Sequence, residues 1–326
     1  MDFWPVTSTL GPSLAGALWL ALLVDRSLGE PPARWHPVVW MGHYLGWMGQ
    51  RIAPQRTQAG EGADITRFVR GALAWSLGAI VITMLAWWLQ RWLLSWHAVV
   101  AMVLLGLLLK PLLAWRMLRD EVQAVETALQ TSLESGRAQL ARLVSRDVST
   151  LDAHQVRESA IESLAENLND SLVAPLFWFA LLGLPGAALY RYANTADAMW
   201  GYRGLREGRD WTWAGKWAAR ADDVLSWIPA RLTALLLALV RGGLSWRILR
   251  AQAPRTPSPN SGWPMAAMAL ALDVRLGKPG VYVLHESGRA PQAGDTLRAV
   301  QLGERVVLLL ALLLGAALLF VGENRA

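Results

Sequence analysis

The chain of 326 residues contains no cysteine. Disulfide bonds, thiolate nucleophiles and cysteine-ligated metals are therefore excluded. Lysine is also scarce, because only Lys110, Lys216 and Lys278 occur, and charged residues of both signs make up 17% of the chain. No Lys or Arg precedes Arg26. Because the basic start of a signal peptide is missing, we expect the first apolar run to be a retained helix.

Two kinds of binding motif are missing as well. Neither GxxxxGK[ST] nor GxGxxG ahead of a helix occurs, so nucleotide phosphates would have to be held in another way. The net charge of +6 comes mostly from arginine, but no basic stripe interleaved with aromatic residues is present. We therefore expect no nucleic-acid binding.

Apolar residues dominate what remains. They make up 54% of the chain, and the mean hydropathy is +0.28. The 19 tryptophans outnumber the tyrosines and phenylalanines together, and many lie at the edges of apolar runs, where indole rings favour the lipid headgroups. This composition indicates an integral membrane protein with substantial polar loops, and it makes the lipid bilayer a partner.

The apolar runs predict an all-α, polytopic fold with about four to six membrane-embedded helices. No alternating pattern is long enough to predict a sheet. The run at about 10–24 is short, and the run at about 228–240 carries Arg231 near its start. The runs lie at about 10–24, 69–89, 98–115, 171–192, 228–240 and 304–321.

The run at 171–192 has two possible arrangements. Pro175 and the GLPG sequence at 183–186 interrupt it, so it either crosses the bilayer as a kinked helix or re-enters on the same side. We favour the re-entrant arrangement, because all polar segments would then share one side. The distribution of arginine predicts that this side is the cytoplasm.

We expect a single integral membrane domain over 1–326, with polar segments that carry amphipathic cytoplasmic helices. In the longest segment we expect a break near Ser135 and Gly136, and a new helix that starts around Ser149 to Asp152, with Ser149 or Thr150 as its cap. The polar segments lie at about 25–68, 116–170, 193–227 and 254–300.

A row of acidic residues lies at the end of the second polar segment. Glu158, Glu162 and Glu166 are four residues apart, and Asp170 continues the spacing. Residues four apart stack on one helix face, where like charges repel each other. With Asn167 they offer hard oxygen ligands suited to Mg²⁺ and phosphate. The alternative is a solvated helix face neutralised by arginines such as Arg157.

Other polar residues follow the apolar runs. Asn194 and Asp197 are neighbours on a helix, although they could also mark an ordinary helix start. Adjacent aspartates such as Asp222 and Asp223 are typical of diacidic metal–phosphate sites, but two neighbouring aspartates alone are a weak signal. The SPNSGW loop at 258–263 is shaped to present the amide of Asn260.

Three arginines are candidates for phosphate binding, because a guanidinium group can bind phosphate with two hydrogen bonds. Arg146 precedes the acidic row, and Arg220 adjoins the aspartate pair. Arg231 could instead extend to the headgroups from a membrane helix. His36, in WHPV at 35–38, is more typical of a packed histidine than of a metal ligand.

These motifs, in this order, resemble the adenosylcobinamide-phosphate synthase family of cobalamin biosynthesis, the CobD/CbiB family. The resemblance covers nearly the whole chain, and seven motifs in register are specific. The first motif combines Asp25 with GEP at 29–31, WHPV at 35–38 and MG at 41–42. The other six are SRD at 145–147, the stretch 162–177, NTADAMWGY at 194–202, ARADD at 219–223, PARL at 229–232 and SPNSGW at 258–263.

The resemblance implies a multi-pass protein of the bacterial inner membrane with a cytoplasmic active face. It implies an ATP-dependent amide ligation that joins adenosylcobyric acid to (R)-1-aminopropan-2-ol or its O-phosphate. Mg²⁺ and ATP would take part, and the corrinoid would be a substrate. Other corrinoid-pathway enzymes are possible partners. Which amine is used stays open.

We add a hypothesis for the residue roles, in which Glu162, Glu166 and Asp170 face Mg²⁺–ATP or the incoming ammonium group. The catalytic set is expected to be Glu162, Glu166, Asp170, Asn167 and Asp197. The metal would bind Glu166, Asp170, Asp222 and Asp223. Phosphate and substrate would be held by Arg146, Asn194, Arg220, Arg231, Asn260, Trp35 and Tyr202, with the aromatic rings against the corrin face.

The chain departs from the family pattern in two places. Pro264 and Met265 follow the SPNSGW loop where the family often has an acidic residue, and Lys278 lies in the glycine-rich element near 276–282. Both departures question a catalytic role for the C-terminal loop. Two other functions stay open, a non-catalytic scaffold for corrinoid-pathway enzymes and a membrane transporter or sensor. A transporter would need acids in a cavity between full spans, whereas the charged segments here lie mainly between the apolar runs.

Overall fold

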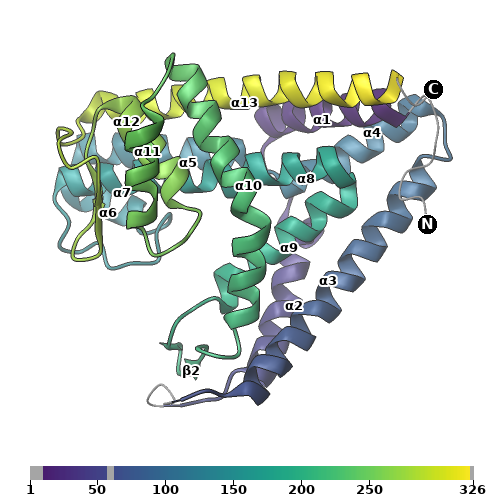
Figure 1. Cartoon of the computed structure of the whole chain (residues 1–326), viewed down its shortest axis with the longest axis horizontal. Coiled ribbons are helices and arrows are strands. Elements are labelled where there is room, and N and C mark those ends of the chain that lie inside the picture. The colour runs from purple at the N-terminus through teal and green to yellow at the C-terminus, as the bar shows by residue number, and fades with distance from the viewer. Residues whose placement is uncertain (1–9, 57–61, 324–326) are drawn as a thin grey trace. The chain divides into compact units, whose positions relative to one another are not determined.

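The computed structural model describes residues 10–56 and 62–323, and nearly all of their regular structure is helical (Figure 1). This confirms the all-α prediction. The α-helices are α1 (Leu10–Leu28), α2 (Pro37–Ile52), α3 (Ile65–Leu93), α4 (Ala98–Leu109), α5 (Trp115–Thr131), α6 (Leu133–Leu140), α7 (Ala153–Leu168), α8 (Ala174–Leu182), α9 (Leu184–Trp200), α10 (Lys216–Arg241), α11 (Trp246–Gln252), α12 (Gly262–Leu272) and α13 (Ala293–Glu323).

Short turns and hairpins connect these helices. The 3-10 turns are η1 (Ala33–Trp35), η2 (Lys110–Leu112) and η4 (Ala253–Arg255), and η3 (Asn169–Val173) is a π-helical turn. The strands form two antiparallel hairpins, β1 (Leu205–Arg206) with β2 (Arg209–Asp210), and β3 (Leu276–Lys278) with β4 (Tyr282–Leu284).

Within the described residues, four helical segments are long and apolar enough to cross a membrane. They are Ile65–Leu93, Ala98–Thr131, Lys216–Arg241 and Ala293–Gly322. The second is interrupted at Leu113, which is extended between η2 and α5. The short run at 228–240 belongs to the 26-residue helix α10. The protein is thus a polytopic helical membrane protein, with the number of spans at the lower end of the prediction.

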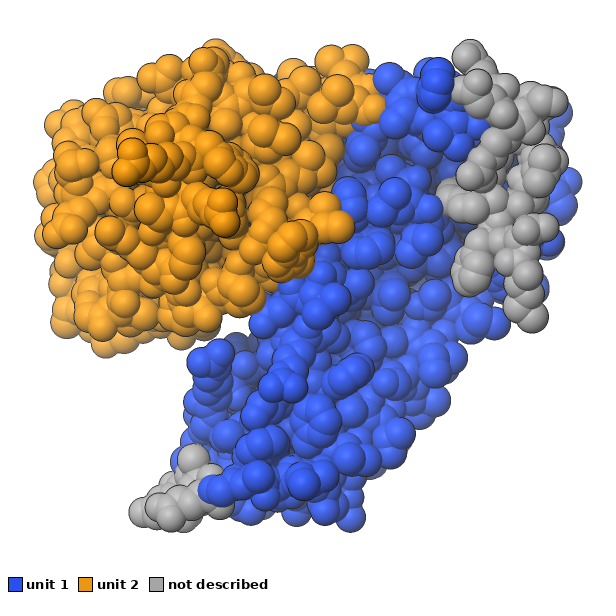
Figure 2. Space-filling view, viewed as in Figure 1, with its two compact units in different colours: residues 1–113, 175–225, 314–326 blue, residues 114–174, 226–313 orange. Residues whose placement is uncertain are grey.

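The chain forms two compact units (Figure 2). Unit 1 comprises residues 1–113, 175–225 and 314–326, and unit 2 comprises 114–174 and 226–313. Each unit draws on distant parts of the sequence, so sequence order alone does not reveal the division. The expected single domain over 1–326 stays a prediction.

Small residues and buried aromatic groups hold unit 1 together. A Cβ atom on Gly106 of α4 would lie 3.0 Å from the carbonyl oxygen of Ala17 on α1, so these helices approach closely. Tyr192 of α9 is fully buried, and its hydroxyl donates a hydrogen bond of 3.1 Å to the Trp75 carbonyl on α3. Helices α3 and α9 are therefore joined by apolar packing and by a satisfied polar group.

The break predicted in 171–192 is present at Gly183. This glycine has φ +70° and ψ −156°, a region open essentially only to glycine. It separates α8 from α9, and the buried amide of Gln90 accepts a hydrogen bond of 2.7 Å from the Leu184 N–H. The run is therefore two helices, and whether it crosses the bilayer stays a prediction.

Replacing Gly183 by Ala is expected to lower the free energy of unfolding by about 1–3 kcal/mol. The added Cβ would collide with the Gln90 amide, and the backbone conformation disfavours any side chain. Thermal unfolding in detergent would measure the loss. Gly42→Ala, on helix α2 with only Met199 within ordinary contact distance, should leave stability unchanged or slightly raised. Equal stability of both variants would contradict the explanation.

Unit 2 packs α7 among α5, α6, α12 and the β3–β4 hairpin. The predicted break in 116–170 is displaced, whereas the new helix starts within the expected stretch, Ser149 to Asp152. Ser132 separates α5 from α6, whereas Ser135 and Gly136 lie inside α6. Helix α7 is capped by Asp152 and not by Ser149 or Thr150. Asp152 is the cap because its carboxylate accepts a hydrogen bond from the Gln155 N–H, while the Gln155 side chain accepts one from the Asp152 N–H. This arrangement is a capping box.

Candidate functional site

The acidic row lies on α7, as its spacing predicts. Glu158 and Glu162 are buried, with 4% and 5% of their surfaces exposed, and Glu166 is half-buried. Asp170 follows in the π-turn η3. A π-turn has a longer hydrogen-bond repeat than an α-helix, so the four-residue spacing no longer places Asp170 directly on the row. The row is therefore formed by the glutamates.

The cations that balance the row come from other segments of unit 2. Arg146 Nη2 lies 3.4 Å from Glu162 Oε2, and it also contacts the Ser159 hydroxyl. Arg275 Nη2 lies 3.4 Å from Glu158 Oε1. Arg157 instead pairs with Glu126 of α5, at 2.9 Å. Arginines do balance the row, as the alternative expected, but Arg157 is not among them, and Glu158 and Glu162 are buried and not solvated.

Glu162 has the chemical character of an acid–base group. Burial raises the pKa of its carboxyl to about 7, even though the Tyr282 hydroxyl and Arg146 favour the charged form. Its buried Oε1 has no hydrogen-bond partner in the described structure. A carboxyl that exchanges protons near neutral pH, with one oxygen left unpaired, can accept a proton from a substrate.

A small cavity of about 370 Å³ lies beside the row in unit 2. Glu158 and Arg275 line it together with Lys278 and Tyr282 of the β3–β4 hairpin. Burial raises the pKa of the Tyr282 phenol, and the negative charge of Glu162 adds to the effect. Ser159, Arg275 and Tyr282 were not among the predicted site residues. The glycine-rich element around Lys278 was the signal for this loop, which does reach the acidic helix.

The remaining predicted residues near the row are held by local hydrogen bonds. The Asn167 amide donates to the Ser163 carbonyl at 2.9 Å. Asp170 Oδ1 accepts a hydrogen bond of 2.7 Å from the Asn169 amide. The amides are thus oriented by the protein itself.

Arg231 and Asn260 are also brought together in unit 2. Arg231 Nη1 donates to Asn260 Oδ1 at 3.1 Å, and its guanidinium lies over the rings of Trp227 and Trp263, at 4.2 Å and 4.8 Å. The SPNSGW loop thus docks on this arginine. Arg231 therefore positions that loop, and its binding of phosphate stays a prediction.

Unit 1 holds the other predicted residues. Asn194 Nδ2 lies 3.5 Å from Asp222 Oδ1, so α9 and α10 bring these residues together. Asp197 is one turn along α9, while Asp223 is half-buried and Arg220 exposed. Tyr202 lies under the Arg206 guanidinium at 3.8 Å, and Trp35 is 64% exposed. Whether these residues and the acidic row act together stays a prediction.

Within the described residues, 10–56 and 62–323, no group of three acidic or histidine side chains is arranged to hold a metal ion by itself. Mg²⁺ often needs only one or two carboxylates, with waters and substrate phosphates completing its shell. Glu166 or Asp170 could supply one such carboxylate, and the unpaired Glu162 Oε1 shows that the row has acceptor capacity to spare. The residues therefore fit a substrate-bridged ion better than an all-protein metal cage.

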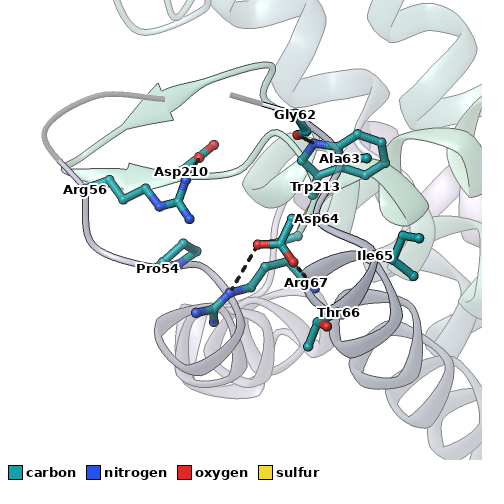
Figure 3. A pocket seen from close by; sticks show the side chains of 11 residues that line it. Pro54, Arg56, Gly62, Ala63, Asp64, Ile65, Thr66, Arg67, Asp210 and Trp213 are labelled. Carbon is teal, nitrogen blue, oxygen red and sulfur yellow. Dashed lines mark hydrogen bonds and ion pairs between the residues drawn. The ribbon is translucent and has the colours of Figure 1, made fainter. Parts of the chain in front are cut away.

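A separate polar pocket of about 400 Å³ lies in unit 1, between the start of α3 and β2 (Figure 3). Arg56 and Arg67 face it, but each is paired with an aspartate, Asp210 at 3.4 Å and Asp64 at 3.9 Å. Asp210 also accepts a hydrogen bond of 2.7 Å from the Thr212 hydroxyl. Because its charges are matched internally, we assign this pocket no ligand.

The fold and the site define a polytopic helical membrane protein with a row of glutamates on α7, two of which, Glu158 and Glu162, are buried. The family model described as CobD/Cbib protein matches residues 18–309. The chain therefore belongs to the CobD/CbiB family, which confirms the resemblance seen in the sequence motifs.

Named relatives match over most of their length. The probable cobalamin biosynthesis protein CobD of Methanothermobacter thermautotrophicus is 39% identical over 315 residues, 95% of this chain and 99% of the relative. The cobalamin biosynthesis protein CobD of Chromobacterium violaceum is 42% identical over 320 residues, 94% and 97% of the two chains. The probable CobD protein of Pyrococcus abyssi is 42% identical, covering 89% and 91%. No solved structure matches the chain.

Proposed function

We propose that the protein acts in cobalamin biosynthesis as an amide ligase of the membrane, on its cytoplasmic face. It would join the free carboxylate of adenosylcobyric acid to the amine of (R)-1-aminopropan-2-ol or its O-phosphate, with ATP as co-substrate. Its family and the names of its relatives support the pathway. The observation that carries the chemistry is Glu162, a buried carboxyl with a pKa of about 7 and an unpaired oxygen.

The reaction needs an activated carboxylate. An oxygen of the substrate carboxylate attacks the γ-phosphorus of ATP, the bond to the β-phosphate breaks, and ADP leaves. The amine nitrogen then attacks the acyl carbon, and inorganic phosphate departs with the electron pair of the broken C–O bond. The amine must lose a proton on the way, which is the task that Glu162 can perform.

The chain's own residues suit these steps. Glu162 Oε1 would accept the amine proton, and Arg146, held by Glu162 and Ser159, would orient the transferred phosphate. Glu166 and Asp170 would contribute carboxylate oxygens to Mg²⁺. When bound, the ion would neutralise phosphate charge in both transfers.

The test is an assay of the purified, reconstituted protein with ATP, Mg²⁺, adenosylcobyric acid and each form of the amine in turn. Mass spectrometry should detect a corrinoid that has gained the aminopropanol unit, and ADP should form in equal amount. A correctly inserted protein without turnover for either amine would overturn the ligase proposal and favour the scaffold function.

Replacing Glu166 by Gln is expected to abolish product formation without loss of membrane insertion. The amide keeps the size of the side chain but removes the charge that would balance the metal. Product yield and the amount of protein in washed membranes should be measured together. Glu286→Gln, at an exposed position in the loop before α13, serves as the control and should keep full activity. Full activity of the Glu166 variant would exclude the assignment.

A further inference from the structure

Unit 1 contains a large apolar groove that takes no part in the ligase steps proposed above, although Trp35, which is expected at the corrin face, lines it. Its volume is about 870 Å³. Helices α2, α3, α4 and the start of α9 line it, along with the end of α1 and the loop that follows. Leu184 and Leu107 are typical of its walls, which carry almost no polar groups apart from one end. Such a groove suits a long apolar ligand.

One wall of the groove is a membrane span. Leu77, Val81 and Leu85 line the groove from α3, yet 53%, 55% and 60% of their surfaces are exposed. Because α3 is apolar along a length that can cross a bilayer, the mouth of the groove opens where lipid tails are present. The bilayer is therefore the nearest source of a ligand.

The polar end of the groove is an ion-pair cluster. Lys110 Nζ lies 2.8 Å from Glu30 Oε2 and 3.4 Å from Asp25 Oδ1. Glu30 Oε2 is also 3.0 Å from His36 Nε2, whose ring accepts a hydrogen bond from the Val38 N–H through Nδ1. Although burial opposes it, the hydrogen bonds from His36 and Lys110 lower the pKa of Glu30, so this end is charged at neutral pH.

Aromatic residues at the same end indicate the level of the headgroups. Trp35 and Trp40 line the groove there and are 64% and 52% exposed. Indole rings with one apolar and one wet side favour the membrane–water interface. The groove thus runs from an interfacial, charged end to an apolar end, which is the polarity of a phospholipid.

We propose that this groove binds one acyl chain of a bilayer phospholipid, with the headgroup at the Glu30–Lys110 end. A corrin ring, which carries many amide groups, would leave them without partners on these apolar walls. A bound chain would cover Val81 and Leu85, and it would shield Glu30, the most exposed member of the cluster, from water, which strengthens its ion pair with Lys110. The lipid would then stabilise the loop that carries GEP at 29–31.

The experiment uses the full chain, delipidated in detergent, with dioleoylphosphatidylethanolamine as the probe. Native mass spectrometry should show one lipid retained per protein at low lipid concentration, and the lipid should raise the thermal midpoint. In Val81→Trp the indole fills the groove. Retention is expected to fall by at least about tenfold, because two methylene groups removed from contact already account for that factor.

The matched control is Ile80→Trp, one residue along α3 and 61% exposed but outside the groove. It should retain lipid like the wild type. Leu85→Trp is a second filling variant, and its midpoint without lipid shows whether it folds. Equal retention in the filling variants and the control would overturn the proposal. So would displacement of the lipid by adenosylcobyric acid, since the groove would then belong to a substrate.

Discussion

Replacing Glu162 by Gln should lower the rate of amide formation by about two to four orders of magnitude, the usual contribution of a general base. Glutamine fills the same buried space but cannot accept the amine proton. Residual product would come from amine that is already neutral in solution. Rates should be measured by mass spectrometry at saturating ATP and corrinoid, so that the loss is assigned to the chemical step.

The pH dependence separates a base from a merely structural residue. Burial raises the pKa of Glu162 to about 7, and a base acts only when deprotonated. The wild-type rate should therefore rise between pH 6 and pH 8, with a midpoint near the pKa of about 7. The Glu162→Gln variant should lose the midpoint near this pKa, and its low residual rate should follow only the fraction of neutral amine.

Two controls make this result interpretable. Glu134→Gln, exposed on α6 of the same unit, should keep both the rate and the pH profile. Tyr282→Phe removes the hydroxyl that favours the charged form of Glu162, so the midpoint should move to higher pH. A Glu162→Gln variant that keeps the wild-type rate and pH profile would exclude Glu162 as the base.

The sequence predicted those features that depend on local spacing. The four-residue interval placed Glu158, Glu162 and Glu166 on one helix face, and the GLPG sequence predicted the break at Gly183. Both predictions hold because helix periodicity and backbone restrictions act over a few residues. The caps were less predictable, since several polar residues compete at a helix start and Asp152 gains from Gln155.

Contacts over long sequence distances could not be predicted in the same way. Tyr282 approaches Glu162 although 120 residues separate them, and no spacing rule links a hairpin to a helix so far away. Its effect on the pKa of Glu162 arises only after folding. Similarly, Lys110 lies at the end of an apolar run, and nothing in the sequence indicates that it pairs with Asp25 and Glu30.

Lys110 is the position where a single change should cost most stability. Its side chain is 4% exposed and lies between Asp25, 1% exposed, and Glu30. Removing one partner of a buried ion pair typically costs about 3–5 kcal/mol, because the remaining charge is left without compensation. Lys110→Met should lower the free energy of unfolding by about that amount, measured by thermal or chemical unfolding in detergent.

The loss should depend on pH in a defined direction. Lys110 and His36 hold the pKa of Glu30 below its usual value of 4.5, and a lowered pKa stabilises the fold above the usual value and not in strong acid. The gap between wild type and Lys110→Met should therefore be largest near neutral pH and shrink as the pH falls below about 4.5. Lys278→Met, exposed in the β3–β4 hairpin, should change stability by no more than about 0.5 kcal/mol. A Lys110→Met protein as stable as the Lys278 variant at neutral pH would mean that the cluster around Glu30 does not hold unit 1 together.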